Sequence, residues 1–250
     1  MPPFSFFPGR ASGGRPDHDT AASQPPDPDT LAALERHRHD DDRHTISHFS
    51  RLLSRHGTSH ASLEWNSRES QERRFEALVE IGVRAGDSLL DVGCGTGDLL
   101  AWLERRHLEV TYTGTDLTPM MVEHARGRFP EHVFVQGCLL DGLALPTPQV
   151  DWVLASGIFA HRRDRPDAYM RDMIAAMLPL ARKGVAVNSL SLKAPDNRRW
   201  RLYHADPDAM IAWATDQVPH AVLREDYDPN DFTLYLYTDP AIARATPWRP

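Results

Sequence analysis

Three glycines at alternate positions, Gly93, Gly95 and Gly97, lie in the segment LLDVGCGTGD at residues 89–98. The apolar residues before them predict a buried strand, and the apolar spacing after them predicts a helix. Glycines let the backbone approach a ligand closely, and the first turn of a helix has unpaired N–H groups. Loops of this kind, at the carboxyl end of a parallel strand, bind nucleotide-like ligands. The segment is therefore a candidate site of that type, and a tight turn without a ligand is the alternative.

The residues around the glycines indicate which ligand fits. The spacing is G-x-G-x-G, whereas dinucleotide-binding loops have G-x-G-x-x-G. Asp91 lies inside the predicted strand, and Asp98 opens the predicted helix, where a pyrophosphate requires positive potential. Anionic phosphate would be repelled, whereas a ligand with an ammonium or sulfonium group would not. A Walker-type loop is excluded, because no Lys followed by Ser or Thr ends the glycine run.

Asp116 follows nineteen residues after Gly97, at the end of the next predicted strand. A carboxylate has two acceptor oxygens and can bind both hydroxyls of a ribose. The alternative is a helix N-cap, for which Thr118 beside Pro119 is also suited. The spacing to the glycine loop favours the ribose role, and an adenosine moiety follows from it.

The motifs LDVGCGTGDL and TGTDLTPMM resemble those of the class I S-adenosylmethionine-dependent methyltransferases, and the similarity extends over residues 62 to 238. The resemblance implies that S-adenosylmethionine is the cofactor, with its methionine and ribose parts wrapped by the glycine loop and its adenine packed on Leu117 and Met120. Cys138 stands where the family often has an acid, so the Leu139 backbone or Asp141 would make that contact. The cofactor residues expected up to this point are Asp91, Gly93, Cys94, Gly95, Thr96, Gly97, Asp116, Leu117, Met120, Cys138 and Leu139.

The segment SGIFAH, residues 156–161, follows the fourth predicted strand, where such a sheet opens its active site. Ser156 and Gly157 are expected to contact the cofactor, because Gly157 permits close approach of the backbone. His161 is the nearest titratable side chain and a candidate general base, since the unperturbed pKa of histidine is about 6.5. The alternative is an exposed loop histidine. Methyl transfer from a sulfonium can also proceed by alignment without a base.

Other polar residues admit two interpretations each. Arg68 or Arg74, before the glycine loop, has a guanidinium suited to the cofactor's carboxylate, and is otherwise a solvated helix charge. Seven of the thirteen histidines lie in the first sixty residues, where His44 and His48 beside Asp40 have metal-site spacing. A segment so rich in His and Arg is more often a solvated surface, so no metal is expected.

From residue 87 onward short apolar runs alternate with helical patterns, which is typical of a mostly parallel sheet between two helical layers. Strands are predicted over 88–92, 110–116, 133–136, 152–156 and 185–190, followed by a hairpin of 221–226 and 232–237. Helices are predicted over 67–81, 98–105, 119–128, 166–182 and 206–217. The expected fold class is α/β, a doubly wound, mostly parallel seven-stranded sheet of Rossmann-like methyltransferase type with a C-terminal antiparallel hairpin strand.

Three segments are expected along the chain. Residues 1–30 hold seven prolines and few apolar side chains, so they are predicted to be a disordered tail. Residues 31–66 are predicted to be a partly helical lid or docking segment, with an apolar stripe that includes Ile46 and Phe49. Residues 67–250 form the predicted methyltransferase domain.

Composition narrows the partners and the compartment. The 250 residues carry 35 acidic and 28 basic side chains, and the net charge of −7 disfavours nucleic acid. No apolar run reaches the roughly 18 residues of a spanning helix, and two cysteines are too few for a disulfide framework, so a cytoplasmic protein with no membrane partner is expected.

We therefore expect an S-adenosylmethionine-dependent methyltransferase acting on a small-molecule acceptor. The lid and residues 191–205, with Arg198 and Trp200, are expected to shape the acceptor pocket. An NAD(P)-dependent oxidoreductase and a non-catalytic S-adenosylmethionine-binding module are the alternatives.

Overall fold

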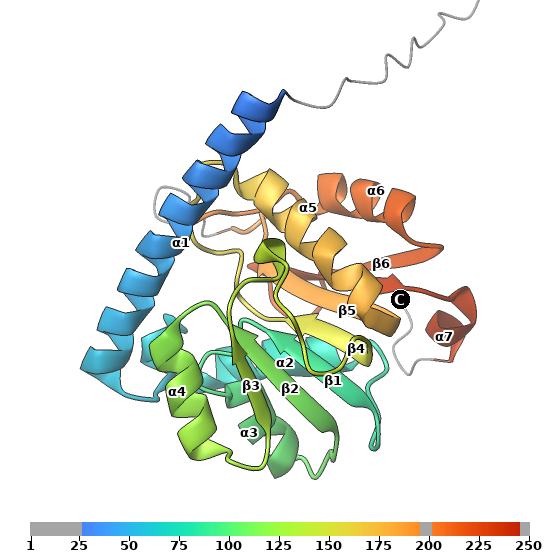
Figure 1. The fold of residues 1–250 in the computed structure, drawn as a ribbon. Helices are drawn as coiled ribbons and strands as arrows, with labels where there is room; N and C mark the ends of the chain where they lie inside the picture. Colours follow the sequence, from blue (N-terminus) through green and yellow to red (C-terminus); the bar gives the residue numbers. More distant parts are fainter. Residues whose placement is uncertain (1–26, 196–201, 246–250) are drawn as a thin grey trace, which may run out of the picture.

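The computed structural model describes residues 27–195 and 202–245 (Figure 1). Most of the predicted tail lies outside these residues, and so do Arg198 and Trp200. The last three residues of the predicted tail, 28–30, belong to the first turn of a helix.

Seven strands form one sheet in the order β3-β2-β1-β4-β5-β7-β6. β7 is antiparallel to both of its neighbours, and the other pairs are parallel. The order reverses between β1 and β4, which is where doubly wound sheets bind their ligands. The predicted fold class is confirmed. The strands are β1 Ser88–Val92, β2 Thr111–Asp116, β3 Val133–Gln136, β4 Val150–Ala155, β5 Ala181–Leu190, β6 His220–Arg224 and β7 Asp231–Tyr237.

Helices cover both faces of the sheet (Figure 1). Among the described residues, no helix combines the length and the hydropathy needed to cross a bilayer. The α-helices are α1 Pro28–His56, α2 Arg68–Val79, α3 Asp98–Arg105, α4 Pro119–Arg128, α5 Pro166–Met177, α6 Pro207–Gln217 and α7 Pro240–Arg244, and the short 3-10 helices are η1 His60–Leu63, η2 Leu139–Asp141 and η3 Leu178–Leu180.

One predicted helix boundary is wrong. The helix predicted over 166–182 ends at Met177, because Pro179 has no N–H group to continue the helical hydrogen bonds, and the chain continues as the 3-10 helix η3. Strand β5 then begins at Ala181, four residues before the predicted strand. The added start of β5 pairs with β4, since Ala181 lies opposite Val150.

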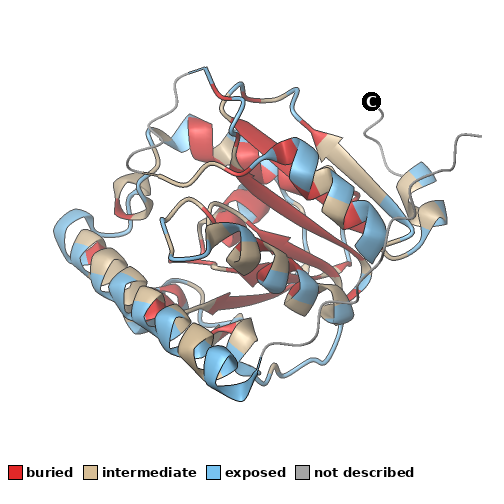
Figure 2. Ribbon diagram, turned by 90° about the horizontal axis from the view of Figure 1, so that it is seen from above, coloured by how far each residue is buried: buried red, intermediate tan, exposed pale blue. Residues whose placement is uncertain are grey.

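Two hydrophobic cores lie on opposite faces of the sheet, because side chains alternate along each strand. In β1, Leu89 packs with α2 and α3, whereas Leu90 packs with the methionine stripe of α5 and with α6. Figure 2 shows the buried strands between helices whose outer sides are exposed. The carboxyl ends of β1, β2, β3 and β4 therefore meet at one edge, between the helices that cover the two faces.

Helix α1 crosses this edge as a 29-residue rod outside the two cores (Figure 1). It buries little apolar surface, with Leu53 as its fully buried apolar side chain. Ion pairs hold it instead: Asp42 pairs with Arg38 on the same helix and with Arg163 in the loop after β4, at 2.7 Å, and Arg38 also pairs with Asp141 in η2. The segment predicted as partly helical is thus mostly one docked helix.

Candidate active site

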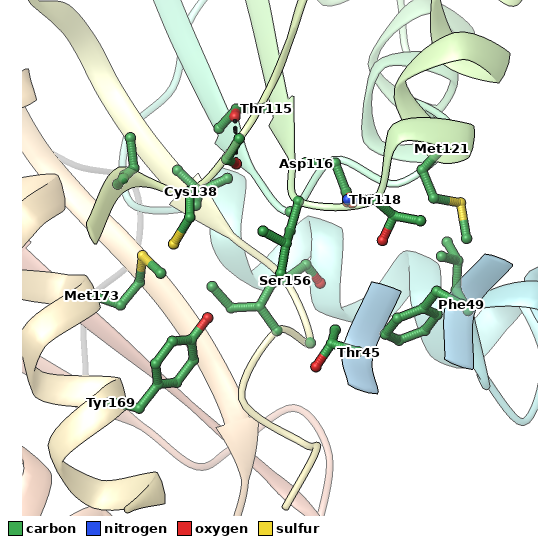
Figure 3. Close-up of a pocket in the computed structure, with 18 of the residues that line it drawn as sticks. Thr45, Phe49, Thr115, Asp116, Thr118, Met121, Cys138, Ser156, Tyr169 and Met173 are labelled. Atoms are coloured by element: carbon green, nitrogen blue, oxygen red, sulfur yellow. Dashed lines mark hydrogen bonds between the residues drawn. The ribbon is translucent and has the colours of Figure 1, made fainter. Parts of the chain in front are cut away.

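A cavity opens at the carboxyl ends of β1 to β4, beneath α1 (Figure 3). It encloses about 840 Å³, its open mouth included. Thr45 and Phe49 of α1 close one side, and Met173 and Tyr169 of α5 close another. Seven of the predicted cofactor residues line it: Gly93, Asp116, Leu117, Cys138, Leu139, Ser156 and Gly157.

The glycine loop gives a ligand room to approach the backbone at this cavity, but it offers few free hydrogen-bond donors. Gly93 has φ +77°, and a Cβ atom there would lie 2.2 Å from Cγ2 of Ile158. Gly93 N–H and Cys94 N–H both donate to the Thr115 carbonyl, at 2.7 and 3.0 Å, and Gly95 N–H donates to Asp116. These three donors are already used within the protein, so the ligand gains close approach to the backbone at this point.

Asp116 lies at the end of β2 with its carboxylate at the cavity. One oxygen accepts the Gly95 N–H at 2.9 Å and the other accepts the Thr118 N–H at 2.7 Å. A carboxylate has about four lone-pair sites, so each oxygen still has acceptor capacity. Burial raises the pKa of Asp116, against the lowering effect of these two N–H groups. The N-cap position of α4 belongs to Thr118, so Asp116 does not cap that helix.

The other two acids near the loop have protein partners. Asp91 is 3% exposed and accepts a hydrogen bond from the Tyr112 hydroxyl at 2.7 Å. Burial raises the pKa of Asp91 to about 7, and the nearby charge of Asp116 adds to this effect. Asp98 is paired with Arg128 at 2.9 Å. The negative charge that the sequence placed around the loop is thus concentrated on Asp116 at the cavity.

The remaining predicted cofactor residues lie away from the cavity lining. Cys94, Gly95, Thr96 and Gly97 are buried in the loop itself. Met120 does not line the cavity, whereas its neighbour Met121 does. The Arg68 side chain is 60% exposed and pairs with Glu72. Burial also raises the pKa of both thiols, Cys94 and Cys138, which does not favour a reactive thiolate.

Asn188 is a site residue that the sequence analysis missed. It lies on β5, is 1% exposed, and accepts the Gly157 N–H at 2.8 Å. Its side-chain NH2 group donates to the Ser156 hydroxyl at 3.3 Å. It therefore fixes the turn after β4 at which Gly157 meets the cavity. The sequence shows an asparagine inside an apolar strand pattern, but not the groups that it contacts.

A second cavity adjoins the first and encloses about 1400 Å³, its mouth included. Phe49, Leu63, Trp65 and Gly157 line both cavities and form the wall between them. The indole ring of Trp65 lies against Gly157, where a Cβ atom would be 2.7 Å from it. The second cavity also reaches Leu202 and His204, the described end of the predicted acceptor segment.

Charges in the second cavity are mostly paired with each other. Arg73 pairs at 3.0 Å with Asp228, in the loop before β7, and Arg74 pairs with Asp231, the first residue of β7. The Arg74 guanidinium also lies 4.9 Å from the Trp65 ring centroid, on its face. Arg74 is therefore already neutralised in this structure, in contrast to its expected pairing with a cofactor carboxylate.

His161 lines the second cavity near Gly157 and contacts Glu64. Its Nε2 atom lies 3.2 Å from Glu64 Oε2, and the same oxygen lies 3.1 Å from His48 Nε2 on α1. Hydrogen bonding from His161, and then from His48, lowers the pKa of Glu64 to about 2. Glu64 is thus ionised at neutral pH, between two imidazoles.

The strand order, the glycine loop and the carboxylate that ends β2 define a class of Rossmann-like proteins that hold a nucleoside at the point where the sheet reverses. A family model described as a methyltransferase domain matches residues 90–184. The protein named putative methyltransferase Rv1506c of Mycobacterium tuberculosis is 33% identical over 165 residues, which cover 62% of this chain and 96% of the relative. The chain belongs to the class I S-adenosylmethionine-dependent methyltransferases, enzymes whose cofactor is S-adenosylmethionine.

Other relatives match over a smaller part of their length. Methyltransferase GfsG of Streptomyces halstedii is 35% identical over 47% of this chain, and a trans-aconitate 2-methyltransferase of Escherichia coli is 26% identical over 52%. These matches cover 44% and 47% of the two relatives. The solved structure of N-methyltransferase NodS from Bradyrhizobium japonicum, a complex with S-adenosyl-L-homocysteine, shares the fold, with a TM-score of 0.57 and 17% identity over 77% of this chain and 97% of that one.

Proposed function

We propose that this methyltransferase acts on a small-molecule acceptor bound in the second cavity, with S-adenosylmethionine bound in the first. The observation that carries the proposal is the shared wall at Gly157 and Trp65, which brings the two cavities together at the end of β4. A methyl group held at this wall has the cofactor on one side and the acceptor on the other.

The cofactor residues predicted from the sequence keep distinct proposed roles. Asp116 accepts hydrogen bonds from the ribose hydroxyls, Leu117 and Leu139 contact the adenine, and Ser156 and Gly157 face the methionine part. Cys138 fills the space beside the adenine. Asp91 and the buried loop residues Cys94, Gly95, Thr96 and Gly97 shape the loop from beneath, whereas Met120 and Arg68 lie too far from the lining for a direct contact.

Methyl transfer is an in-line displacement. The acceptor's lone pair forms a bond to the methyl carbon while the carbon–sulfur bond breaks, and the sulfonium becomes the neutral sulfide of S-adenosylhomocysteine. Alignment across the wall supplies much of the rate acceleration, because the sulfonium is already an activated leaving group. His161 is the proposed catalytic residue, since its imidazole lies on the acceptor side of the wall.

Two further observations favour a small acceptor. A relative is named as a trans-aconitate 2-methyltransferase, after a small-molecule acceptor. The arginines of the second cavity are paired with aspartates, so they do not form the unpaired basic surface that nucleic acid requires. The two free cysteines support a reducing compartment, and we propose the cytoplasm.

The experiment is a screen for S-adenosylhomocysteine formation across pooled metabolites. We expect the wild-type chain to convert a fraction of the pools, and Asp116→Asn to lose this activity together with about ten- to hundred-fold in S-adenosylmethionine affinity, the cost of a charge-assisted hydrogen bond. Asp216→Asn, on an exposed position of α6, serves as the matched control and should match the wild type. Unchanged cofactor affinity in Asp116→Asn would remove Asp116 from the site.

A further inference from the structure

Three metal-ligating side chains meet at the edge of the second cavity. His48 comes from α1, Glu64 from the residue after η1, and His161 from the loop after β4. One ligand atom from each side chain lies within 4.8 Å of the other two. These segments are far apart in the sequence, so the fold brings the three groups together.

The distances within this cluster suit a metal ion. Bonds of about 2.0 to 2.1 Å from zinc to His nitrogen or carboxylate oxygen, at a tetrahedral angle, place neighbouring ligand atoms about 3.3 Å apart. Glu64 Oε2 lies 3.1 Å from His48 Nε2 and 3.2 Å from His161 Nε2. Both imidazoles therefore present the same kind of nitrogen to one carboxylate oxygen, at the separation that ligands of one ion have.

The surroundings also support a ligand at this point. Glu64 has φ +59° and ψ +21°, a left-handed conformation that few residues other than glycine adopt and that is concentrated at functional sites. The Phe49 ring packs edge-on against His161 and His48, with ring centroids 4.9 and 5.3 Å apart, and gives the cluster an apolar wall. His48 Nε2 is buried, and its polar neighbour is the Glu64 carboxylate at 3.1 Å.

We infer that His48, Glu64 and His161 bind one divalent transition-metal ion, with zinc as the ion that this ligand set suits best. Two histidines and one carboxylate form the ligand set of catalytic zinc sites, which keep a further position open. Glu64 and His161 both line the second cavity, so the open position faces the acceptor. The sequence analysis had favoured no metal, because it weighed only the neighbouring pair His44 and His48 with Asp40.

The ion would define the class of acceptor, an inference that rests on the proposed function. A hydroxyl or thiol bound to zinc loses its proton to solvent more readily, since the ion stabilises the anion that remains. The resulting oxygen or sulfur anion then attacks the methyl carbon, and the sulfide leaves as S-adenosylhomocysteine. His161 would act as a ligand in this case, and the ion would take the part expected of a general base.

Cobalt(II) is a probe for this site, because tetrahedral cobalt(II) absorbs visible light and competes with zinc. The full chain is dialysed against EDTA and titrated with CoCl2, with S-adenosylmethionine affinity measured on the same preparation. We expect one cobalt(II) ion per chain, a visible band, and loss of the band on adding one equivalent of ZnCl2. His48→Ala and Glu64→Gln should weaken binding at least tenfold, whereas His44→Ala, at an exposed position one turn earlier on α1, should bind as the wild type does.

Binding to a three-segment site also predicts a stability change. Zinc would join α1 to the core and raise the melting temperature of the wild type and of His44→Ala, but not of His48→Ala. Absence of a stoichiometric band in the wild type, or an unchanged band in His48→Ala, overturns the metal site. If S-adenosylmethionine still binds in that experiment, the proposed methyl transfer stands without the ion; if neither binds, the proposed function fails as well.

Discussion

Asp91 is a carboxyl group held away from water, directly beneath the glycine loop. Its polar contact is the Tyr112 hydroxyl, and the negative charge of Asp116 lies nearby. Removing a carboxylate from water disfavours its charged form, and this raises the pKa to about 7. The sequence shows the acid before the glycines, but the burial that sets its charge depends on neighbouring strands.

The raised pKa of Asp91 predicts a pH-dependent stability. The carboxyl of Asp91 stays protonated in the folded chain between about pH 4 and 7, while it ionises in the unfolded chain near its reference pKa of about 3.9. Its contribution is therefore fully present at about pH 4 and is lost as the pH rises to about 7. At 1.36 kcal/mol per pKa unit, the loss is on the order of 4 kcal/mol.

Asp91→Asn tests this expectation, because its amide stays neutral and its carbonyl oxygen can still accept the Tyr112 hydrogen bond. Urea unfolding of the cofactor-free chain from pH 4 to 8 should show a flatter profile for the variant and a higher free energy of unfolding than the wild type at pH 8. Tyr112→Phe removes a group that lowers the pKa, so it should move the wild-type transition to higher pH. Parallel profiles for Asp91→Asn and wild type would show that Asp91 is ionised in the fold.

At the scale of elements, α1 is attached by charges rather than by an apolar face. Asp42 is 5% exposed, and the side chain of its partner Arg163 is equally buried, while the Arg163 guanidinium lies over the Tyr169 ring, 3.7 Å from its centroid. A buried charge that loses its partner is strongly unfavourable, by about 3 to 5 kcal/mol. This makes Asp42 the residue on which the docking of α1 depends.

We expect Asp42→Ala to release α1 without unfolding the sheet. Trypsin should then cleave within α1 at least tenfold faster than in the wild type, and the affinity for S-adenosylmethionine should fall, because Thr45 and Phe49 leave the cavity. Asp40→Ala removes an exposed carboxylate two residues earlier and should leave both measurements unchanged. Equal cleavage rates in the two variants would contradict the proposed role of residues 31–66 as a lid.

At the scale of the whole molecule, a cofactor that binds only the folded chain must stabilise it. At a concentration one hundred times its Kd, S-adenosylmethionine should add about 2.7 kcal/mol, which corresponds to a rise of roughly 5 to 10 °C in melting temperature for a chain of this size. NADH at the same concentration should cause no rise. The reverse outcome, a rise with NADH alone, would favour the oxidoreductase that the glycine loop by itself leaves open.

Local sequence patterns were sufficient to predict most of the helices and strands. The strands 88–92 and 133–136 and the helices 98–105 and 119–128 agree with β1, β3, α3 and α4 residue for residue. The apolar period marks α3, whereas Pro119 at the first position marks the start of α4. The length of α1 was less clear, since its apolar stripe is weak and its docking depends on ion pairs with distant loops. Such pairs have no local signature.

Some residues of the candidate site could likewise be predicted from local sequence motifs, and others could not. Gly93, Asp116 and Gly157 follow strands in motifs of fixed spacing, so the sequence could place them at the cavity. Glu64 and Asn188 could not be identified as site residues, because their partners His161 and Ser156 come from a different part of the chain. Arg68 was predicted from its guanidinium and its place before the glycine loop, but in the structure its side chain is turned toward solvent.

The position of α1 over the cofactor cavity has a kinetic consequence. Thr45 and Phe49 would cover S-adenosylmethionine bound as we propose, so both the entry of the cofactor and the exit of S-adenosylhomocysteine would require α1 to separate from the loop after β4. We expect association to be slower than diffusion allows, and product release to limit the turnover rate. The ion pairs of Asp42 would then limit the turnover rate, although Asp42 does not contact the reacting groups.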